Sequence, residues 1–315
     1  GRVVPWQMLK YVVLAAAALY ASYTSWPYRV ACAVDGLARL LRRPTRDLDA
    51  CLEAYDYLVN GTAEFDASTL DATSIETEHV RAYYSVLNDV LAVADIEKMY
   101  IPPQLLPSEG LYDNQRVWER RLFDSMGIRG GHLLDVGCGR GRIAHHAATY
   151  TDSNVSGFNI DAAQIEHAVA YAASTGMSDR LAFATGDHHE RFDYPDEHFD
   201  GSYSFQAVWP FFKRRELDGV ARELYRVLKP GGVYVCGEYL LTPHFDRNDA
   251  SHRALHRLFL PTLAATQSNY PSDVTGALER AGFVIERSAP SDAPAWPLTD
   301  QKTSLIRFLR AFTFG

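Results

Sequence analysis

The chain has 315 residues, of which 47% are hydrophobic and 22% are charged, so it can bury a core large enough for one large domain or for a domain with a sizeable appendage. Its formal net charge of -8 argues against the basic surface with which proteins bind nucleic acid. The four cysteines show no C-x-x-C spacing, which favours buried thiols in a reducing compartment over disulfides.

The first 30 residues contain an apolar, alanine-rich run at residues 8–21, broken only by Lys10. This run is near the lower limit of length for a membrane-spanning helix, and the aromatic residues on both sides are typical of interfacial anchors. We expect residues 1–30 to form a hydrophobic helix and no signal peptide. Contact with a membrane and docking on a protein surface both remain open.

Residues 31–128 are expected to be mainly helical. A polar stretch at residues 60–77 separates two helical segments, and apolar positions over residues 79–99 repeat with helical spacing. Three prolines follow, and residues 114–126 then form a further helix that leads into the first strand.

A glycine-rich motif follows that strand. Asp135 and Val136 end a short apolar run, Gly137, Gly139 and Gly141 follow at alternate positions, and a helical pattern begins at Arg142. Strand, glycine turn and helix form a nucleotide-binding half unit, but the spacing D-x-G-x-G-x-G departs from the dinucleotide fingerprint. It resembles motif I of the class I S-adenosylmethionine-dependent methyltransferases, in which the glycine loop lies under the methionine half of the cofactor. A structural turn in another doubly wound sheet is the alternative.

From this motif onward, strands alternate regularly with helices. The strands are expected at residues 132–136, 154–158, 181–185, 199–204, 233–239 and 283–287, and the helices between and after them at residues 161–175, 214–228, 248–263 and 273–281. The alternation predicts a mainly parallel sheet with helices on both faces. We therefore expect an α/β, Rossmann-like class I methyltransferase domain at residues 129–315, preceded by an N-terminal helical extension. The antiparallel seventh strand of that class is not evident, and residues 305–314 favour a helix.

Ligands of open parallel sheets bind beyond the carboxyl ends of the strands, so residues at those ends are the site candidates. Asn159 is placed to accept from ribose hydroxyls and Asp187 from the adenine amino group, with His188 nearby. The residues expected to bind the cofactor are Asp135, Gly137, Cys138, Gly139, Gly141, Asn159, Gln164, Asp187, His188 and Phe205. The residues expected on the acceptor side are Gln206, Trp209, Glu238 and Tyr239, with Glu238, Gln206 and Tyr239 as catalytic candidates.

A narrower resemblance covers roughly residues 80–310. The segments LLDVGCGRG, GFNIDAAQI, GDHHERFDYPDEHFD, ELYRVLKPGG and GEYLLTPHFD, in that order, resemble the sterol C24-methyltransferase group. Asn159 in place of an acid, Glu238-Tyr239 followed by Thr242, and the pair Tyr83-Tyr84 resemble details of that group.

This resemblance implies an enzyme that converts S-adenosyl-L-methionine to S-adenosyl-L-homocysteine. The methylated acceptor is expected to be a sterol or another lipophilic isoprenoid, and the reaction a C-methylation. Residues 31–128 would then form a lid or substrate-binding region that includes Tyr83 and Tyr84. The expected location is the cytoplasmic side, with association with the endoplasmic-reticulum membrane through the N-terminal helix.

Two segments depart from the group. Residues 95–102 stand where it has an aromatic Y-E-x-G-W-G segment, and Gln206 stands where it has an acid. A small-molecule N- or O-methyltransferase acting on an amine or a phenolic natural product is therefore an alternative. A cofactor-binding but catalytically silent subunit is a second one. The paired histidines at 145–146 and 188–189 lack the ligand spacing of a metal site, and no metal is expected.

Overall fold

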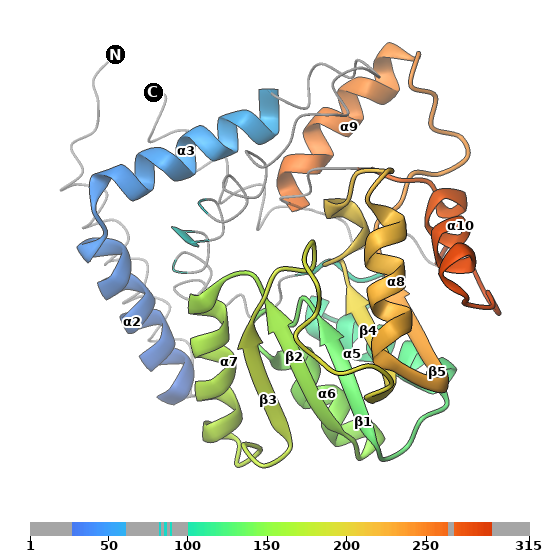
Figure 1. Ribbon diagram of the computed structural model, residues 1–315. Helices are drawn as coiled ribbons and strands as arrows, with labels where there is room; N and C mark the ends of the chain where they lie inside the picture. Colours follow the sequence, from blue (N-terminus) through green and yellow to red (C-terminus); the bar gives the residue numbers. More distant parts are fainter. Residues whose placement is uncertain are drawn as a thin grey trace.

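The computed structural model describes residues 27–60, 82, 85, 86, 89, 100–263 and 268–291 (Figure 1). The apolar run at residues 8–21, the helix expected at residues 305–314, and Tyr83 and Tyr84 lie outside the described residues. Within the described part of the chain, no helix combines the length and the apolar character needed to cross a bilayer.

Five parallel strands form one sheet in the order β3-β2-β1-β4-β5. The strands are β1 (His132–Val136), β2 (Asn154–Asn159), β3 (Leu181–Thr185), β4 (Phe199–Phe205) and β5 (Leu228–Gly237). The chain steps from β1 outward to β3 and then returns to β4 on the other side of β1. The strand order therefore reverses between β1 and β4, and ligands of such sheets bind beyond the carboxyl ends of the strands at this point. The expected parallel α/β fold is confirmed.

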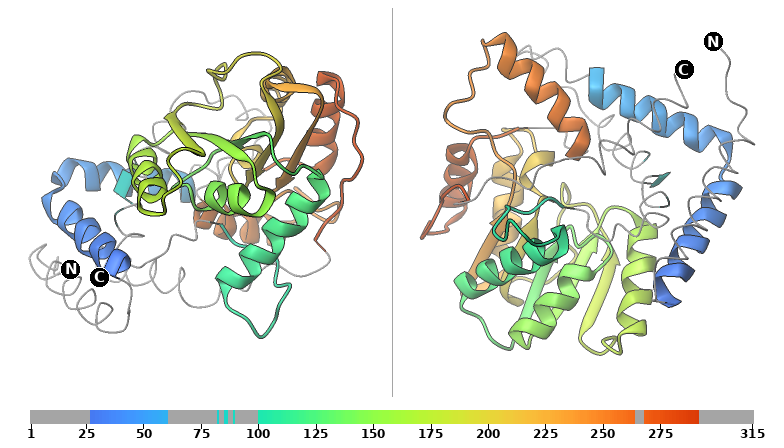
Figure 2. Two further views of the ribbon diagram at one scale, coloured as in Figure 1. Left: turned by 90° about the horizontal axis from the view of Figure 1, so that it is seen from below. Right: turned by 180° about the vertical axis from the view of Figure 1, so that it is seen from behind.

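Helices cover both faces of the sheet, so the domain has three layers (Figures 1 and 2). One face carries α5 (Leu111–Met126), α6 (Arg142–Thr151) and α7 (Ala162–Ser174), and the other carries α8 (Leu217–Val227) and α10 (Pro271–Ala281). Neighbouring residues of β1 divide between the layers, because successive side chains of a strand point to opposite faces. Leu133 packs in the cluster under α5 and α6, and Leu134 packs in the cluster under α8.

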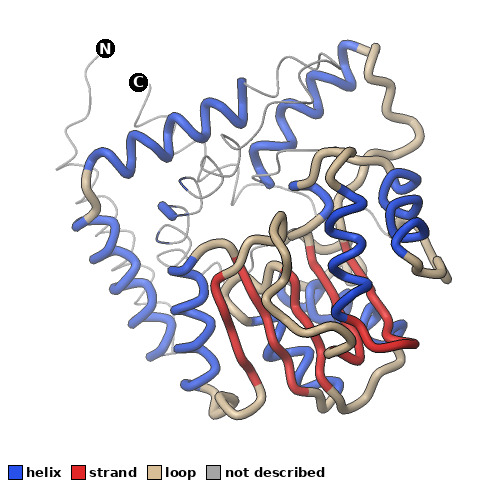
Figure 3. Tube along the Cα trace, viewed as in Figure 1, coloured by secondary structure: helices blue, strands red, loops and turns tan. Residues whose placement is uncertain are grey.

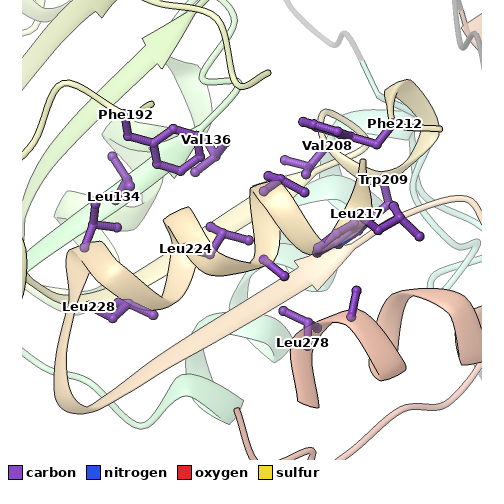
Figure 4. Packing of buried hydrophobic residues seen from close by; sticks show 14 of the residues in the cluster. Leu134, Val136, Phe192, Val208, Trp209, Phe212, Leu217, Leu224, Leu228 and Leu278 are labelled. Carbon is purple, nitrogen blue, oxygen red and sulfur yellow. The ribbon is translucent and has the colours of Figure 1, made fainter. Parts of the chain in front are cut away.

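The cluster under α8 contains large buried side chains from several elements (Figure 4). Leu217 and Leu224 of α8, Leu278 of α10, and Trp209 of the short 3-10 helix η3 (Trp209–Phe211) contribute to it. Trp209 is fully buried there. The structure therefore places this predicted acceptor contact inside the core.

Helices α2 (Pro27–Arg42), α3 (Thr45–Asn60) and α9 (Ala250–Leu263) lie outside the three layers (Figure 3). Arg39 of α2 contacts His167 of α7 at 2.8 Å, and α3 contacts α9. Figure 1 shows α3 and α9 beyond the carboxyl ends of the strands. Helices α3 and α9 therefore lie on the side of the sheet where the candidate site residues are found.

Three sequence expectations for the last part of the sheet and its helices are wrong. Residues 283–287 form no strand, although Phe283 and Ile285 pack against the core while Val284 is 86% exposed. This inward and outward alternation mimics a strand, but the segment pairs with none among the described residues. In addition, β5 begins at Leu228 rather than Val233, and α8 begins at Leu217 rather than Arg214. Leu228 pairs with Phe199 before an irregularity, and regular pairing resumes between Val233 and Gly201.

Candidate functional site

The glycine loop turns sharply between β1 and α6. Gly137 and Gly141 adopt φ values of +77° and +81°, in the left-handed region that side chains other than glycine rarely adopt. A Cβ on Gly137 would lie 2.4 Å from the Cβ of Ala207, just beyond β4. The loop is fastened to β2, because the N–H groups of Gly137 and Cys138 both donate to the Phe158 carbonyl, at 3.0 and 3.1 Å. This backbone can therefore approach a ligand as closely as the motif predicts.

Asp135, the last residue but one of β1, has an unpartnered oxygen. Its side chain is buried, and its Oδ2 has no hydrogen-bond partner. Burial raises the pKa of this carboxyl to about 8. The hydroxyl of Tyr203, which pairs with Asp135 across the sheet, faces this carboxyl and partly offsets the effect of burial.

Asn159 and Gln164 form a unit at the end of β2. Asn159 Nδ2 donates to Gln164 Oε1 at 2.9 Å, and Gln164 is itself buried at the start of α7. This bond orients the Asn159 amide, so that its oxygen is the atom left to accept from a ribose hydroxyl. Asp161 caps α7 by accepting from the N–H of Ala163 at 2.8 Å.

Asp187 and two histidines follow β3. Burial opposes ionisation of Asp187, but hydrogen bonds from the ring and the N–H of His189, both at 2.9 Å, outweigh it and hold its pKa at about 2. Burial lowers the pKa of His188 to about 3, so this ring is neutral against Phe212. Ligand atoms of Asp187, His188 and His189 lie within 4.8 Å of one another, a spacing that could hold a metal ion. Both nitrogens of His189 already have partners, since Nε2 lies 3.2 Å from the Phe211 carbonyl.

Glu238 lies directly after β5 and is a buried carboxyl with one oxygen fixed and one unpartnered. Its Oε1 accepts from Ser204 Oγ at 2.7 Å and from the N–H groups of Ala207 and Val208 at 3.3 and 3.4 Å. Its Oε2 is buried without a partner. Burial raises the pKa of Glu238 to about 7. Such a group can gain or lose a proton near neutral pH.

Gln206 and Tyr239, the other catalytic candidates, bind the main chain of Ile101. Gln206 Nε2 donates to the Ile101 carbonyl at 2.7 Å, and Tyr239 Oη donates to the same oxygen at 2.9 Å.

Phe205 and Cys138, two of the predicted cofactor contacts, are both buried. Phe205 packs against Tyr100, with ring centroids 5.4 Å apart. Cys138 is buried, and burial raises its thiol pKa, which leaves it protonated. Among the described residues, Cys138 and Cys236 form no disulfide.

A buried ionic network that no sequence pattern predicts lies beside the glycine loop. Glu119 of α5 is fully buried and binds Arg142, the first residue of α6, through both oxygens. Its carboxylate also contacts His146 Nδ1 at 2.5 Å and accepts from Tyr100 Oη at 2.6 Å. Burial raises the pKa of Glu119, but Arg142 and His146 outweigh burial, so the net direction is downward. The available signal was a glutamate within the amphipathic pattern of residues 114–126.

These features suit a cofactor with an amino-acid half and an adenosine half. The glycine cradle and the unpartnered Asp135 oxygen lie at the end of β1, Asn159 at the end of β2, and Asp187 after β3. Parallel strands bring these three ends to one edge of the sheet. The residues present therefore fit S-adenosylmethionine.

Comparison with known proteins agrees with this fit. Residues 133–232 match the family described as methyltransferase domain. Fold, site and family together define the chain as a class I S-adenosylmethionine-dependent methyltransferase. Within this class, it is similar to the sterol 24-C-methyltransferases. It is 29% identical to the one from Neurospora crassa over 89% of this chain and 76% of that protein.

A second relative and a solved structure extend the comparison. A sterol 24-C-methyltransferase of Gibberella zeae is 38% identical over 70% of this chain and 58% of its own length, so this chain spans little more than half of that relative. The structure of a geranyl diphosphate methyltransferase in complex with GPP and sinefungin superposes with a TM-score of 0.56. It is 18% identical and covers 68% of this chain and 83% of that one. At that identity the likeness shows the fold.

Proposed function

We propose that this enzyme transfers a methyl group from S-adenosylmethionine to a carbon atom of a lipophilic isoprenoid acceptor of the sterol type. The observation that carries the proposal is the buried carboxyl of Glu238, with its unpartnered Oε2 at the carboxyl end of β5. The names of the relatives support a sterol acceptor and a carbon as the methylated atom. Residues 101–103 are buried and apolar, and the Ile101 carbonyl accepts from Tyr239, the residue after Glu238, which suits a hydrocarbon acceptor.

S-adenosylmethionine, when bound, supplies an electrophilic methyl group on its sulfonium. Methylation of an alkene forms a carbon–carbon bond with the alkene π electrons and breaks the carbon–sulfur bond of the donor, which leaves a carbocation on the acceptor. Ionised Glu238 stabilises this cation electrostatically. It then accepts the proton whose loss forms the new alkene, so charge and atoms balance.

Three donors fix the orientation of the Glu238 carboxyl. Ser204 Oγ and the N–H groups of Ala207 and Val208 all donate hydrogen bonds to Oε1. The second oxygen, Oε2, is therefore the one available to the reacting atoms. Burial of this oxygen strengthens its interaction with a cation, because the local dielectric is low.

Contact with a membrane belongs to the same proposal. A lipophilic acceptor partitions into bilayers, and the apolar run at residues 8–21 with its aromatic flanks suits the interface of the endoplasmic-reticulum membrane on its cytoplasmic side. Co-flotation of the full chain with phosphatidylcholine vesicles, and its loss in a Leu14→Asp variant, is the expected result. Equal flotation of both proteins would contradict membrane contact through this run.

The experiment that tests the proposed function has two parts. Calorimetric titration with S-adenosylhomocysteine measures cofactor binding, and a tritiated-methyl assay then compares sterols with a side-chain double bond, linear isoprenoids, amines and phenols. Label in the non-saponifiable lipid fraction supports the proposal. Label confined to amines or phenols would replace it with a small-molecule N- or O-methyltransferase. Tight binding without turnover of any acceptor would indicate a catalytically silent subunit.

A further inference from the structure

We propose that Gln206 and Tyr239 are positioning residues that clasp the main chain of Ile101 and hold residues 100–103 beside Glu238 as a wall of the acceptor site. We call these two side chains and the Ile101 peptide groups the Ile101 clasp. The role of this wall toward the acceptor rests on the proposed function. The clasp itself consists of hydrogen bonds within the protein, so it can be tested without an acceptor.

Three hydrogen bonds make up the Ile101 clasp. The Ile101 N–H donates to Gln206 Oε1 at 3.1 Å, and Gln206 Nε2 donates back to the Ile101 carbonyl at 2.7 Å. Tyr239 Oη donates to the same carbonyl at 2.9 Å. An amide can accept and donate at once, whereas an ionised carboxylate can only accept. The clasp therefore explains a glutamine at this position better than it would explain an acid.

The backbone of Gln206 is held in an unusual conformation that aims this amide. Gln206 has a φ of +52°, in the left-handed region, which costs a residue other than glycine about 1–2 kcal/mol. Its N–H donates to the Gly237 carbonyl at 3.0 Å, which ties the end of β4 to the end of β5. Ala207, the next residue, donates to Glu238. The turn after β4 therefore positions both the Gln206 amide of the clasp and the N–H that binds the Glu238 carboxyl.

Tyr100, the residue before Ile101, is hydrogen-bonded to α5 rather than to the strand ends beside Glu238. Tyr100 Oη donates to Glu119 Oε1 at 2.6 Å, and Glu119 binds Arg142 at the start of α6. Gln115 Nε2 donates to the Tyr100 carbonyl at 2.7 Å. Consecutive residues are thus fixed to the two halves of the site: Tyr100 to the helix that follows the glycine loop, and Ile101 to the strand ends beside Glu238.

The wall beside the carboxyl is apolar and buried. Ile101 is 4% exposed, and Pro102 and Pro103 are also buried. Tyr239 follows Glu238, and Gln206 precedes Ala207, whose N–H donates to Glu238, so the clasp and the proposed base are attached to the same two strand ends. Loosening the clasp should displace the wall, weaken acceptor binding, and leave the cofactor side at the ends of β1 to β3 intact.

Hydrogen exchange at Ile101 reads the clasp directly. Pro102 and Pro103 carry no N–H, so Ile101 supplies the sole exchanging amide of residues 101–103, and its acceptor is Gln206. In the apo full-length protein, Gln206→Met should accelerate exchange at Ile101 by about tenfold or more, because two of the three hydrogen bonds are lost. Tyr239→Phe should accelerate it by about threefold, because the bond to the Ile101 N–H remains.

Two control variants separate the clasp from general effects. Gln104→Met makes the same change three residues from Ile101 at a side chain outside the clasp. Tyr150→Phe removes a hydroxyl that bonds to Asp124 on the surface. Both controls should leave exchange at Ile101 within about twofold of the native chain. Exchange in β1 reports whether any variant opens the whole domain.

Kinetics on the proposed acceptor complete the test. Gln206→Met should raise the acceptor KM by about tenfold, while affinity for S-adenosylhomocysteine stays within about twofold. Gln206→Glu should recover part of the lost acceptor affinity as pH falls, since a protonated carboxyl can donate and accept as the amide does.

Each outcome decides a separate part of the proposal. Unchanged exchange at Ile101 in Gln206→Met would overturn the clasp. Faster exchange with unchanged acceptor KM would overturn its positioning role. Absence of turnover with every acceptor would overturn the proposed function, and exchange at Ile101 would still decide the clasp.

Discussion

Glu119 of α5 and Arg142, the first residue of α6, form a buried ion pair in which the guanidinium donates a hydrogen bond to each carboxylate oxygen. The pair joins the helix before the sheet to the helix that begins at the glycine loop. Neither side chain is more than 7% exposed. Removing one partner of such a pair is costly, because the other charge stays buried without compensation.

Glu119→Gln should therefore destabilise the protein by about 3 kcal/mol, measured by urea denaturation. Asp124→Asn is the matched control, because it breaks an ion pair with Arg129 in which both side chains are about half exposed. Exposed pairs contribute only about 0–1 kcal/mol. Equal losses in the two variants would show that the buried pair contributes no more than a surface one.

Gly137→Ala should weaken binding of S-adenosylhomocysteine by about tenfold or more, because the new Cβ would lie 2.4 Å from Ala207 and displace the loop. Gly130→Ala is the control with nearly the same φ, +76° against +77°, and with nothing within 4 Å of its Cβ. Both variants carry a backbone cost of about 1 kcal/mol, and Gly137→Ala alone carries the clash. Calorimetry that found the same affinity in both would contradict a close approach of this loop to the cofactor.

The parts of the site predicted from sequence are those that local patterns determine. Gly137 and Gly141 follow a buried strand, and Asn159 and Asp187 follow the next two, so parallel pairing alone brings them to one edge. The contacts that were missed join residues far apart in the chain. Glu119 lies 23 residues from Arg142, and Ile101 lies 105 from Gln206, and no periodicity reports such pairs.

Two further expectations depend on packing in the same way. Trp209 follows β4, where an acceptor contact is expected, and packing under α8 buries it fully, so its contact with the acceptor stays a prediction. Phe283 and Ile285 alternate as strand residues do, yet strand pairing depends on a neighbour that the sequence pattern does not specify. The roles of Glu238, Gln206 and Tyr239 in catalysis remain predictions.

Glu238→Gln should lower kcat by about 10²–10⁴-fold, because the amide neither carries the charge that stabilises a cation nor accepts its proton. Binding of S-adenosylhomocysteine should be unchanged within about twofold, since the proposed place of Glu238 is on the acceptor side. Glu279→Gln, an exposed change on α10, controls for the substitution itself. Activity of Glu238→Gln equal to that of this control would remove Glu238 from the mechanism.

The pH dependence of kcat/KM should report the ionisation of Glu238. A base must be ionised to act, and burial raises the pKa of Glu238 to about 7, so kcat/KM should rise with pH and level off above this value. Ser204→Ala removes a hydrogen bond that favours the ionised form, which raises the pKa further. The rising limb should therefore move to higher pH in this variant. A limb that stays in place, or moves to lower pH, would assign the titration to another group.

The most direct measurement is the position of the transferred methyl group. The enzyme would be incubated with a donor carrying a deuterated methyl group and, in separate reactions, with a sterol that has a side-chain double bond and with its saturated counterpart. We expect label on a side-chain carbon of the unsaturated sterol and none in the saturated one. Label on oxygen or nitrogen, or equal labelling of both sterols, would contradict methylation of an alkene carbon.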